Sequence, residues 1–162
     1  MGLDSAQIHA AVQAKFPQAI VEDQVAAVDP FLVIRPEELE SVAFFCRDDE
    51  SLQLDMLSCI TGVDYPERQA IEVIYSLDST TQHHRLTIKV QLPRDNPTVS
   101  TVESVWRTAD WHERETYDLL GVDFAGHHNL IRILCAEDWE GHPLRKDYVM
   151  PESYHGIKNV VY

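Results

Sequence analysis

Residues 111–148 read WHERETYDLLGVDFAGHHNLIRILCAEDWEGHPLRKDY, and this stretch decides the fold. It holds two of the three Trp and four of the eight His residues of the protein. Asp110 is a residue type that favours the position before a helix, and Glu113 follows at the spacing of a capping box. Gly121 stands where a residue with a left-handed backbone would end the helix. The pattern therefore predicts a short helix between Asp110 and Gly121.

Charged and apolar residues share both sides of this predicted helix. At about 100° per residue, Arg114 and Asp118 fall on the same side as Trp111. A surface helix usually separates such groups, so this helix either packs its charges against a partner or buries a paired network. A solvated charged face is the plain alternative. Arg114 and Asp118 are four residues apart and can form an ion pair.

The end of the stretch, residues 141–148, reads GHPLRKDY. Gly141 and Pro143 favour a turn. Arg145 and Lys146 lie among acidic neighbours, so charge-assisted hydrogen bonds can hold a rigid loop here. A surface turn fits the same residues equally well.

Four segments of the chain carry a family resemblance. They are EREtYDLLGVdF at residues 113–124, GHhNLiRIL at 126–134, WEGHPLRKDY at 139–148 and LSCITGVDYP at 57–66. Together they resemble the C subunit, also called the 30-kDa subunit, of the proton-pumping NADH–quinone oxidoreductase known as respiratory complex I. Two departures are His128 and Val149, which stand where the family usually has Pro. Both lie in predicted turns, so they affect local loop geometry only.

The resemblance implies a peripheral-arm component of an oxidoreductase and translocase that catalyses no reaction by itself. It implies a chain without cofactors, because the FMN and iron–sulfur clusters of such an enzyme belong to partner subunits. The implied partners are other peripheral-arm subunits, chiefly the quinone-site subunit and the cluster-bearing subunit, which this chain would scaffold. The implied location is peripheral, on the cytoplasmic side of the bacterial inner membrane, with membrane contact only through partners. Since the chain ends soon after the motifs, we expect no fused quinone-site subunit.

Twelve positions follow from the resemblance as structural or partner-interface residues, with no catalytic role among them. We also hypothesise that the charges among them are neutralised across a subunit contact and not within the chain. The positions are Glu113, Arg114, Glu115, Tyr117, Asp118, Gly121, Arg132, Gly141, Pro143, Arg145, Lys146 and Asp147.

Two other functions remain as alternatives. The same family serves ferredoxin- or deazaflavin-dependent dehydrogenases and energy-converting hydrogenases, in which other subunits recognise the electron donor. A free-standing metal-dependent hydrolase would instead use the histidines. The zinc motif HExxH fails here because Thr116 occupies the place of its second histidine. Adjacent histidines on a strand point to opposite sides, so the pair at 127–128 is expected in a turn or at a strand end and not on one ion.

Composition excludes several classes of protein. The chain has 162 residues and a net charge of −14, most of it in residues 1–80. No basic stripe is present for nucleic-acid phosphates or for anionic lipid. No apolar run is long enough to span a membrane, and the N-terminus does not resemble a signal peptide, so a cytoplasmic chain is expected. The three Cys are far apart, which supports neither a disulfide framework nor a cluster site, and no nucleotide-binding glycine motif occurs.

Hydrophobic periodicity predicts a mixed order of helices and strands. Residues 70–77 and 84–92 are predicted to form a hairpin, and apolar and polar side chains alternate in its second strand. The other expected elements are helices at 5–16, after Pro36 and from Ser100 or Thr101 to Ala109, and strands at 19–28, 31–34, 52–63 and 130–134, with 52–63 in the centre of the sheet. These elements predict an α+β domain in which helices pack on a mixed, mainly antiparallel sheet, forming two layers. We expect this domain over residues 1–148, followed by an extended, partner-binding tail at 149–162.

Overall fold

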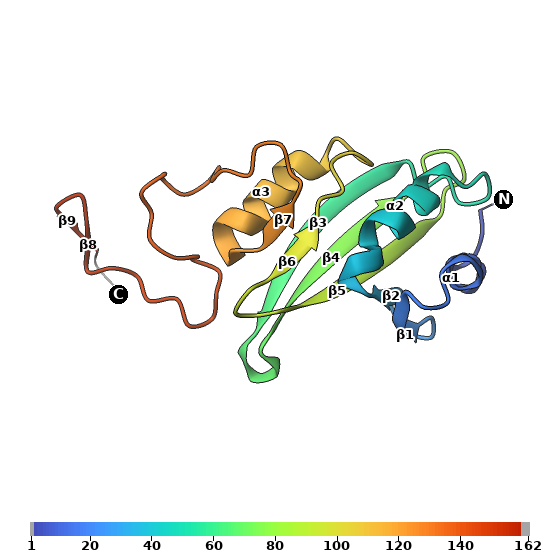
Figure 1. The fold of residues 1–162 in the computed structure, drawn as a ribbon, viewed down its shortest axis with the longest axis horizontal. Coiled ribbons are helices and arrows are strands. Elements are labelled where there is room, and N and C mark those ends of the chain that lie inside the picture. Colours follow the sequence, from blue (N-terminus) through green and yellow to red (C-terminus); the bar gives the residue numbers. More distant parts are fainter. Residues whose placement is uncertain (1, 160–162) are drawn as a thin grey trace.

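A computed structural model describes residues 2–159 of the chain (Figure 1). Three helices, nine strands and two short 3₁₀ turns are present in this part of the chain. In chain order they are α1 (Ser5–Lys15), β1 (Ile20–Gln24), β2 (Phe31–Ile34), η1 (Pro36–Glu38), α2 (Leu39–Asp48), β3 (Met56–Tyr65), η2 (Pro66–Arg68), β4 (Ala70–Asp78), β5 (Arg85–Pro93), β6 (Thr98–Ser100), α3 (Ala109–Leu120), β7 (Asp123–Ala125), β8 (Ser153–Tyr154) and β9 (Ile157–Lys158).

The main sheet has five strands in the order β1-β2-β5-β4-β3. Only β2 and β5 run parallel, so the predicted mixed, mainly antiparallel sheet is confirmed. The predicted hairpin is also confirmed, since β4 and β5 pair with Leu77 opposite Leu86 and Ile71 opposite Leu92. The first predicted strand is shorter than expected, because the chain turns after Gln24.

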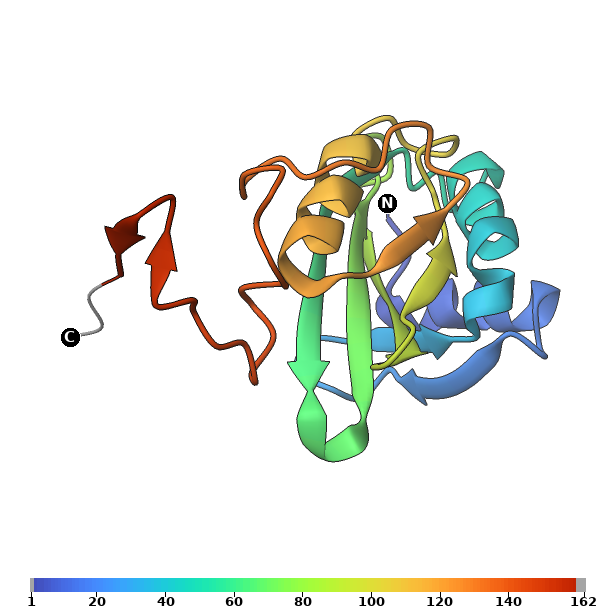
Figure 2. The same cartoon turned by 60° about the vertical axis from the view of Figure 1, so that its left-hand side comes forward.

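Helices α2 and α3 lie on the same face of this sheet, with the small parallel pair β6–β7 between them (Figures 1 and 2). Helix α2 turns Leu39, Val42, Ala43 and Cys46 inward, which is the stripe that its sequence predicts. Alternate residues of β5 are buried and belong to the same hydrophobic core as this stripe of α2. The structure is therefore the predicted two-layer α+β arrangement.

Strand β3 lies at an edge of the sheet and not in its centre, which corrects the prediction for residues 52–63. Its apolar residues are explained by α3, which packs on it. A side chain at Gly62 would collide with Leu120 and touch Thr116 of that helix. Gly62 thus allows α3 to approach the strand closely.

The predicted helix that follows Ser100 does not form. Residues 102–108 make successive turns, in which the main-chain N–H groups of Val105 and Trp106 both donate to the carbonyl of Val102. Its apolar residues nevertheless reach the core, and Trp106 Nε1 donates to the Leu54 carbonyl at 2.9 Å. Short turns can place apolar residues at the same spacing as a helix, and for this reason the periodicity wrongly predicted a helix here.

Helix α3 ends as predicted, because Gly121 adopts a left-handed conformation with φ 74°. Its start differs from the prediction, since Thr108 is the residue before the helix and Asp110 lies in the first turn. The expected capping box is absent, because the Glu113 side chain bonds to Thr101 and Val102 instead. Tertiary contacts override the local capping pattern.

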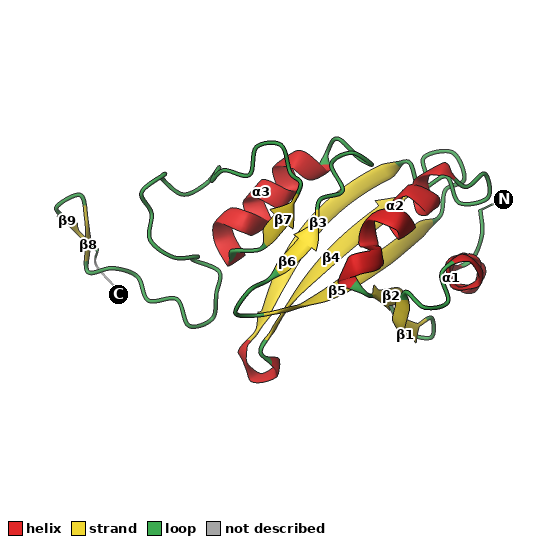
Figure 3. Ribbon diagram, in the orientation of Figure 1, coloured by secondary structure: helices red, strands yellow, loops and turns green. Residues whose placement is uncertain are grey.

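After β7 the chain continues to residue 152 without helix or strand, and it extends away from the sheet (Figures 1 and 3). The strand predicted at 130–134 is wrong, since its backbone donors turn to one carboxylate, described below. The tail forms the small hairpin β8–β9, and Tyr154 packs against Trp139 at 5.1 Å between ring centroids. Residues 160–162 of the predicted tail lie outside the described residues. No helix within residues 2–159 has the length and apolar character needed to cross a membrane.

Candidate functional site

The buried carboxylate of Asp118 organises residues 111–148, which we call the motif segment. Its side chain is fully buried and accepts hydrogen bonds from the main-chain N–H groups of Ile133, Leu134 and Cys135 at 2.8–3.1 Å. Arg132 Nη1 donates to it at 2.7 Å. Burial by itself raises the pKa of a carboxyl, but these donors outweigh it and lower the pKa of Asp118 to about 2. A permanent negative charge therefore holds the loop after β7 against α3.

Arg132 connects Asp118 with the turn at Gly141. Its Nη2 donates to the Gly141 carbonyl at 3.0 Å, and its Nη1 also donates to the Asp118 carbonyl. His142 Nδ1 donates to the same Asp118 carbonyl at 3.0 Å. A side chain at Gly121 would collide with the His142 ring, so the helix end needs Gly for space as well as for φ.

Arg94 forms a second buried network with two carboxylates. It donates to Asp64 at 2.7 and 2.9 Å and to Asp147 at 2.6 and 3.0 Å. The Asp64 side chain is fully buried and also accepts the N–H of Lys146 at 2.8 Å. Hydrogen bonding to Arg94 lowers the pKa of both carboxyls below their ordinary range. The network fixes the end of the motif segment to the ends of β3 and β5.

Arg145 completes the attachment of this loop. Its Nε donates to the Leu120 carbonyl at 2.7 Å, which satisfies one of the free carbonyls at the end of α3. Its Nη1 donates to the Arg94 carbonyl at 3.3 Å. The predicted rigid loop is therefore present, but its cation binds main-chain carbonyls and not the neighbouring acids.

Glu113 lies fully buried on the inner side of α3. Its carboxylate accepts the Thr101 hydroxyl and the Val102 N–H, the latter at 2.8 Å. Burial is the main cause that raises the pKa of Glu113 to about 7, and the charges of Glu103 and Asp110 add to it. Glu113 thus holds the turns after β6 against the helix.

The outer side of α3 is open. Trp111 is 63% exposed, and the guanidinium of Arg114 lies 5.0 Å from the centre of its ring. Arg114 Nε also donates to the Ile131 carbonyl at 3.2 Å. The predicted ion pair of Arg114 with Asp118 does not form, because Asp118 is buried and bonded to Arg132.

The hypothesis that charges of the motif segment are neutralised across a subunit contact is wrong for three residues. Asp118 and Arg132 neutralise each other, and Asp147 binds Arg94, all within the chain. Of the other predicted positions, Glu115 and Lys146 are exposed and Pro143 and Tyr117 are half-buried. Tyr117 packs edge-on against His142. A role in binding a partner stays a prediction for all twelve.

Sequence reasoning missed three residues of the site: Asp64, Arg94 and Thr101. Asp64 lies within one of the four family segments, so the resemblance contained it without giving it a role. Arg94 and Thr101 lie outside all four segments. No local spacing connects Arg94 with Asp147, since 53 residues separate them.

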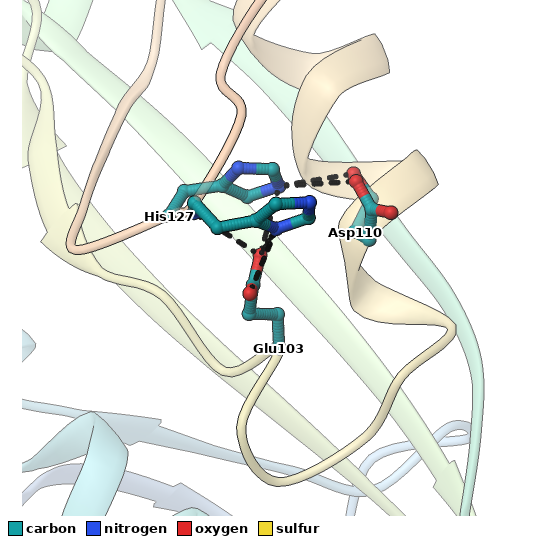
Figure 4. A group of neighbouring side chains, drawn as sticks. Glu103, Asp110 and His127 are labelled. Carbon is teal, nitrogen blue, oxygen red and sulfur yellow. Dashed lines mark hydrogen bonds and ion pairs between the residues drawn. The ribbon is translucent and has the colours of Figure 1, made fainter.

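His127 and His128 lie in a turn, as predicted. The argument that adjacent histidines point to opposite sides, and so cannot bind the same ion, does not apply to them. The rings of His127 and His128 stack at 5.3 Å with an angle of 10°, because the pair follows β7 and is not on a strand. Both rings face Glu103 and Asp110 (Figure 4). The other adjacent pair is structural at least in part, since His84 accepts the Leu3 N–H and contacts the Leu52 carbonyl.

Comparison with known proteins gives consistent matches. The family described as "Respiratory-chain NADH dehydrogenase, 30 Kd subunit" matches residues 32–154. The C subunit of the NADH-quinone oxidoreductase of Chlorobium phaeobacteroides is 43% identical over 149 residues, which is 91% of this chain and 90% of that protein. The corresponding protein of Chloroherpeton thalassium is 42% identical over 149 residues, and here the match spans 91% of this chain but 62% of the longer relative.

A solved structure shares the fold. The trypsin-resistant fragment (1–134) of Nqo5 superposes with a TM-score of 0.63 and 27% identity. The superposition covers 79% of this chain and all of that fragment.

Proposed function

Because the chain belongs to the family of the 30-kDa subunit of the respiratory-chain NADH dehydrogenase, we propose that it is a scaffold component of an NADH–quinone oxidoreductase. The assembled enzyme would pass electrons from NADH to quinone, and this chain would catalyse no step of that transfer. Its partners would be other peripheral-arm subunits, chiefly the quinone-site subunit and the cluster-bearing subunit.

The surface of the C-terminal half carries this proposal. Among residues 2–159, seven of the eleven large apolar side chains that are exposed lie at or after residue 111: Trp111, Ile131, Leu134, Leu144, Val149, Met150 and Ile157. Exposed apolar groups that are concentrated in one part of a protein are typical of protein–protein contact sites. Asp118, Arg132, Arg145 and Asp147 are bonded within the chain, so a partner would meet these apolar groups together with exposed charges such as Glu115 and Lys146.

The FMN and iron–sulfur clusters would belong to partner subunits. A cluster needs four thiolates in most cases, whereas this chain has three Cys, which lie on α2, on β3 and in the loop after β7. Cys46 is fully buried on α2, and burial raises the pKa of its thiol to about 12, which disfavours the thiolate. Membrane association on the cytoplasmic side would come through the partners.

The test is a pull-down of the tagged full chain from detergent-solubilised native membranes, read by mass spectrometry and visible absorbance. We expect the quinone-site and cluster-bearing subunits to co-purify, together with the NADH-binding subunits. A ferredoxin- or deazaflavin-dependent dehydrogenase would instead bring its own donor-binding subunits. A chain that emerges alone would overturn the proposal.

A pair of matched variants locates the contact. Leu134→Asp changes an exposed apolar residue of the motif segment, whereas Val21→Asp changes one on β1. Their exposed fractions are 63% and 62%, so the two changes remove similar apolar surface, and the melting temperature of each purified variant is measured before the pull-down. We expect co-purification to be lost for Leu134→Asp and kept for Val21→Asp. Equal retention in both variants would exclude the motif segment as the contact site.

A further inference from the structure

Four side chains from three separate segments converge beside the first turn of α3. Glu103 follows β6, Asp110 lies on α3, and His127 and His128 follow β7 (Figure 4). One ligand atom from each residue lies within 4.8 Å of the ligand atoms of the other three. We propose that these four residues form a binding site for a divalent transition-metal ion such as zinc, which the scaffold role does not require.

The distances suit a tetrahedral ion. Zinc bonds to imidazole nitrogen and carboxylate oxygen are about 2.1 Å long, so tetrahedral ligand atoms lie about 3.4 Å apart. His127 Nε2 is 3.4 Å from Glu103 Oε2 and 3.4 Å from Asp110 Oδ1. His128 Nδ1 lies closer, 2.8 Å from Glu103 Oε2. Because 60% of the His128 side chain is exposed, its ring is free to move outward and complete the set.

The charge around the cluster favours a cation. The carboxylates of Glu103, Asp110 and Glu113 all lie within 4 Å of His127 Nε2. Within residues 2–159, none of the three forms an ion pair with Lys or Arg. Asp110 Oδ1 is buried without a hydrogen-bond partner, which is costly unless another group binds it. A divalent ion would both neutralise the carboxylates and provide a partner for Asp110 Oδ1.

Metal binding breaks two hydrogen bonds of His127. Its Nδ1 accepts the N–H of Asn129 at 3.0 Å and its Nε2 donates to the main-chain carbonyl of Asp110 at 3.2 Å, so a neutral ring carries its proton on Nε2. Coordination through Nε2 moves this proton to Nδ1, and the Asn129 N–H must then bind water. Asn129 is exposed, so water can replace the lost acceptor.

The bound ion would join the turns after β6, the start of α3 and the turn after β7. A surface pocket of about 490 Å³ adjoins the cluster and is lined also by Ser104, Arg107 and Trp111. Solvent or a partner side chain can therefore reach the ion. His128 stands where the family usually has Pro, so we expect the site in this chain and not throughout the family.

The test is a zinc titration of the tag-free full chain after chelator treatment, measured by calorimetry. Elemental analysis then gives the zinc content of the protein. We expect one zinc ion per chain and a higher melting temperature with zinc. His128→Ala and Asp110→Asn should each weaken binding at least tenfold. Cobalt substitution should add the visible absorption of a tetrahedral cobalt site in the wild type.

His155→Ala is the matched control. Its side chain is 61% exposed and pairs with Asp138 at 2.7 Å, so it resembles His128 without belonging to the cluster. We expect it to bind zinc as the wild type does. Equal affinity in all variants, or less than one ion per chain, would overturn the proposal. If Asp110→Asn fails to fold, Glu103→Gln replaces it with the same expected loss. Neither result bears on whether the chain assembles with other subunits.

Discussion

Arg94, which follows β5, donates two hydrogen bonds to Asp147 near the end of the motif segment, at 2.6 and 3.0 Å. The same guanidinium holds the fully buried Asp64 at the end of β3. One arginine therefore fastens the C-terminal loop to the sheet, and it lies outside every sequence motif of the chain.

Arg94→Ala should be strongly destabilising, because it leaves the Asp64 carboxylate buried without its cation. Loss of one partner from a buried pair costs about 3–5 kcal/mol, which urea unfolding would measure. Arg68→Ala is the control, since Arg68 is exposed, its guanidinium lies over the Tyr65 ring, and its loss should cost about 1 kcal/mol or less. Similar losses in both variants would show that the Arg94 network contributes little.

Asp118→Asn should lower stability by about 1.5–3 kcal/mol at neutral pH, as expected for hydrogen bonds to a charged group. The pKa of Asp118 in the fold is about 2, below its ordinary value of 3.8. The folded state therefore favours the ionised form, and its contribution is present above pH 4 and lost as the pH falls towards 2. Unfolding at pH 7, 4 and 2.5 should show the gap between wild type and variant closing. A gap that is constant with pH would contradict this assignment.

Gly121→Ala should cost more than Gly126→Ala. Both positions have a left-handed backbone, with φ of 74° and 88°. A side chain there costs about 1–2 kcal/mol in either case. At Gly121 it would also collide with the His142 ring, whereas at Gly126 it meets Thr101 at an ordinary 3.5 Å. Thermal unfolding of the two variants separates backbone strain from this collision, and equal losses would argue that His142 moves aside freely.

Arg114→Ala and Arg145→Ala should separate assembly from stability. Arg145 donates to the carbonyls of Leu120 and Arg94, so its loss should lower the melting temperature of the isolated chain. Arg114 lies over the exposed ring of Trp111, so its loss should leave stability within about 1 kcal/mol. We expect Arg114→Ala to weaken the pull-down of partner subunits per folded molecule. The opposite pattern would remove Arg114 from the contact site.

Local sequence patterns predicted the structure correctly where contacts between nearby residues determine it. The hairpin β4–β5 follows from strict alternation, and the end of α3 follows from Gly121. Both depend on residues that are close together in the sequence. The family resemblance added the subunit identity, which no periodicity contains.

The errors have one cause in common, which is contact between distant residues. β3 was expected in the centre of the sheet because its residues are apolar, yet α3 covers them. A strand was expected at 130–134, but Asp118 binds the backbone donors there. The expected capping box gave way to the bonds of Glu113 with Thr101 and Val102. The sequence likewise could not predict that Glu103, Asp110, His127 and His128 lie close together, because they come from three separate segments.

The close approach of α3 to Gly62 also has a consequence for biosynthesis. All five strands of the main sheet precede Arg94, so a nascent chain can pair them before α3 has been made. Until that helix arrives, the surface of β3 at Gly62 stays uncovered and Asp64 lacks the main-chain donor of Lys146. A chain that stops before residue 109 would therefore present a finished sheet with an uncovered apolar face, which is the kind of surface that chaperones recognise and that aggregates.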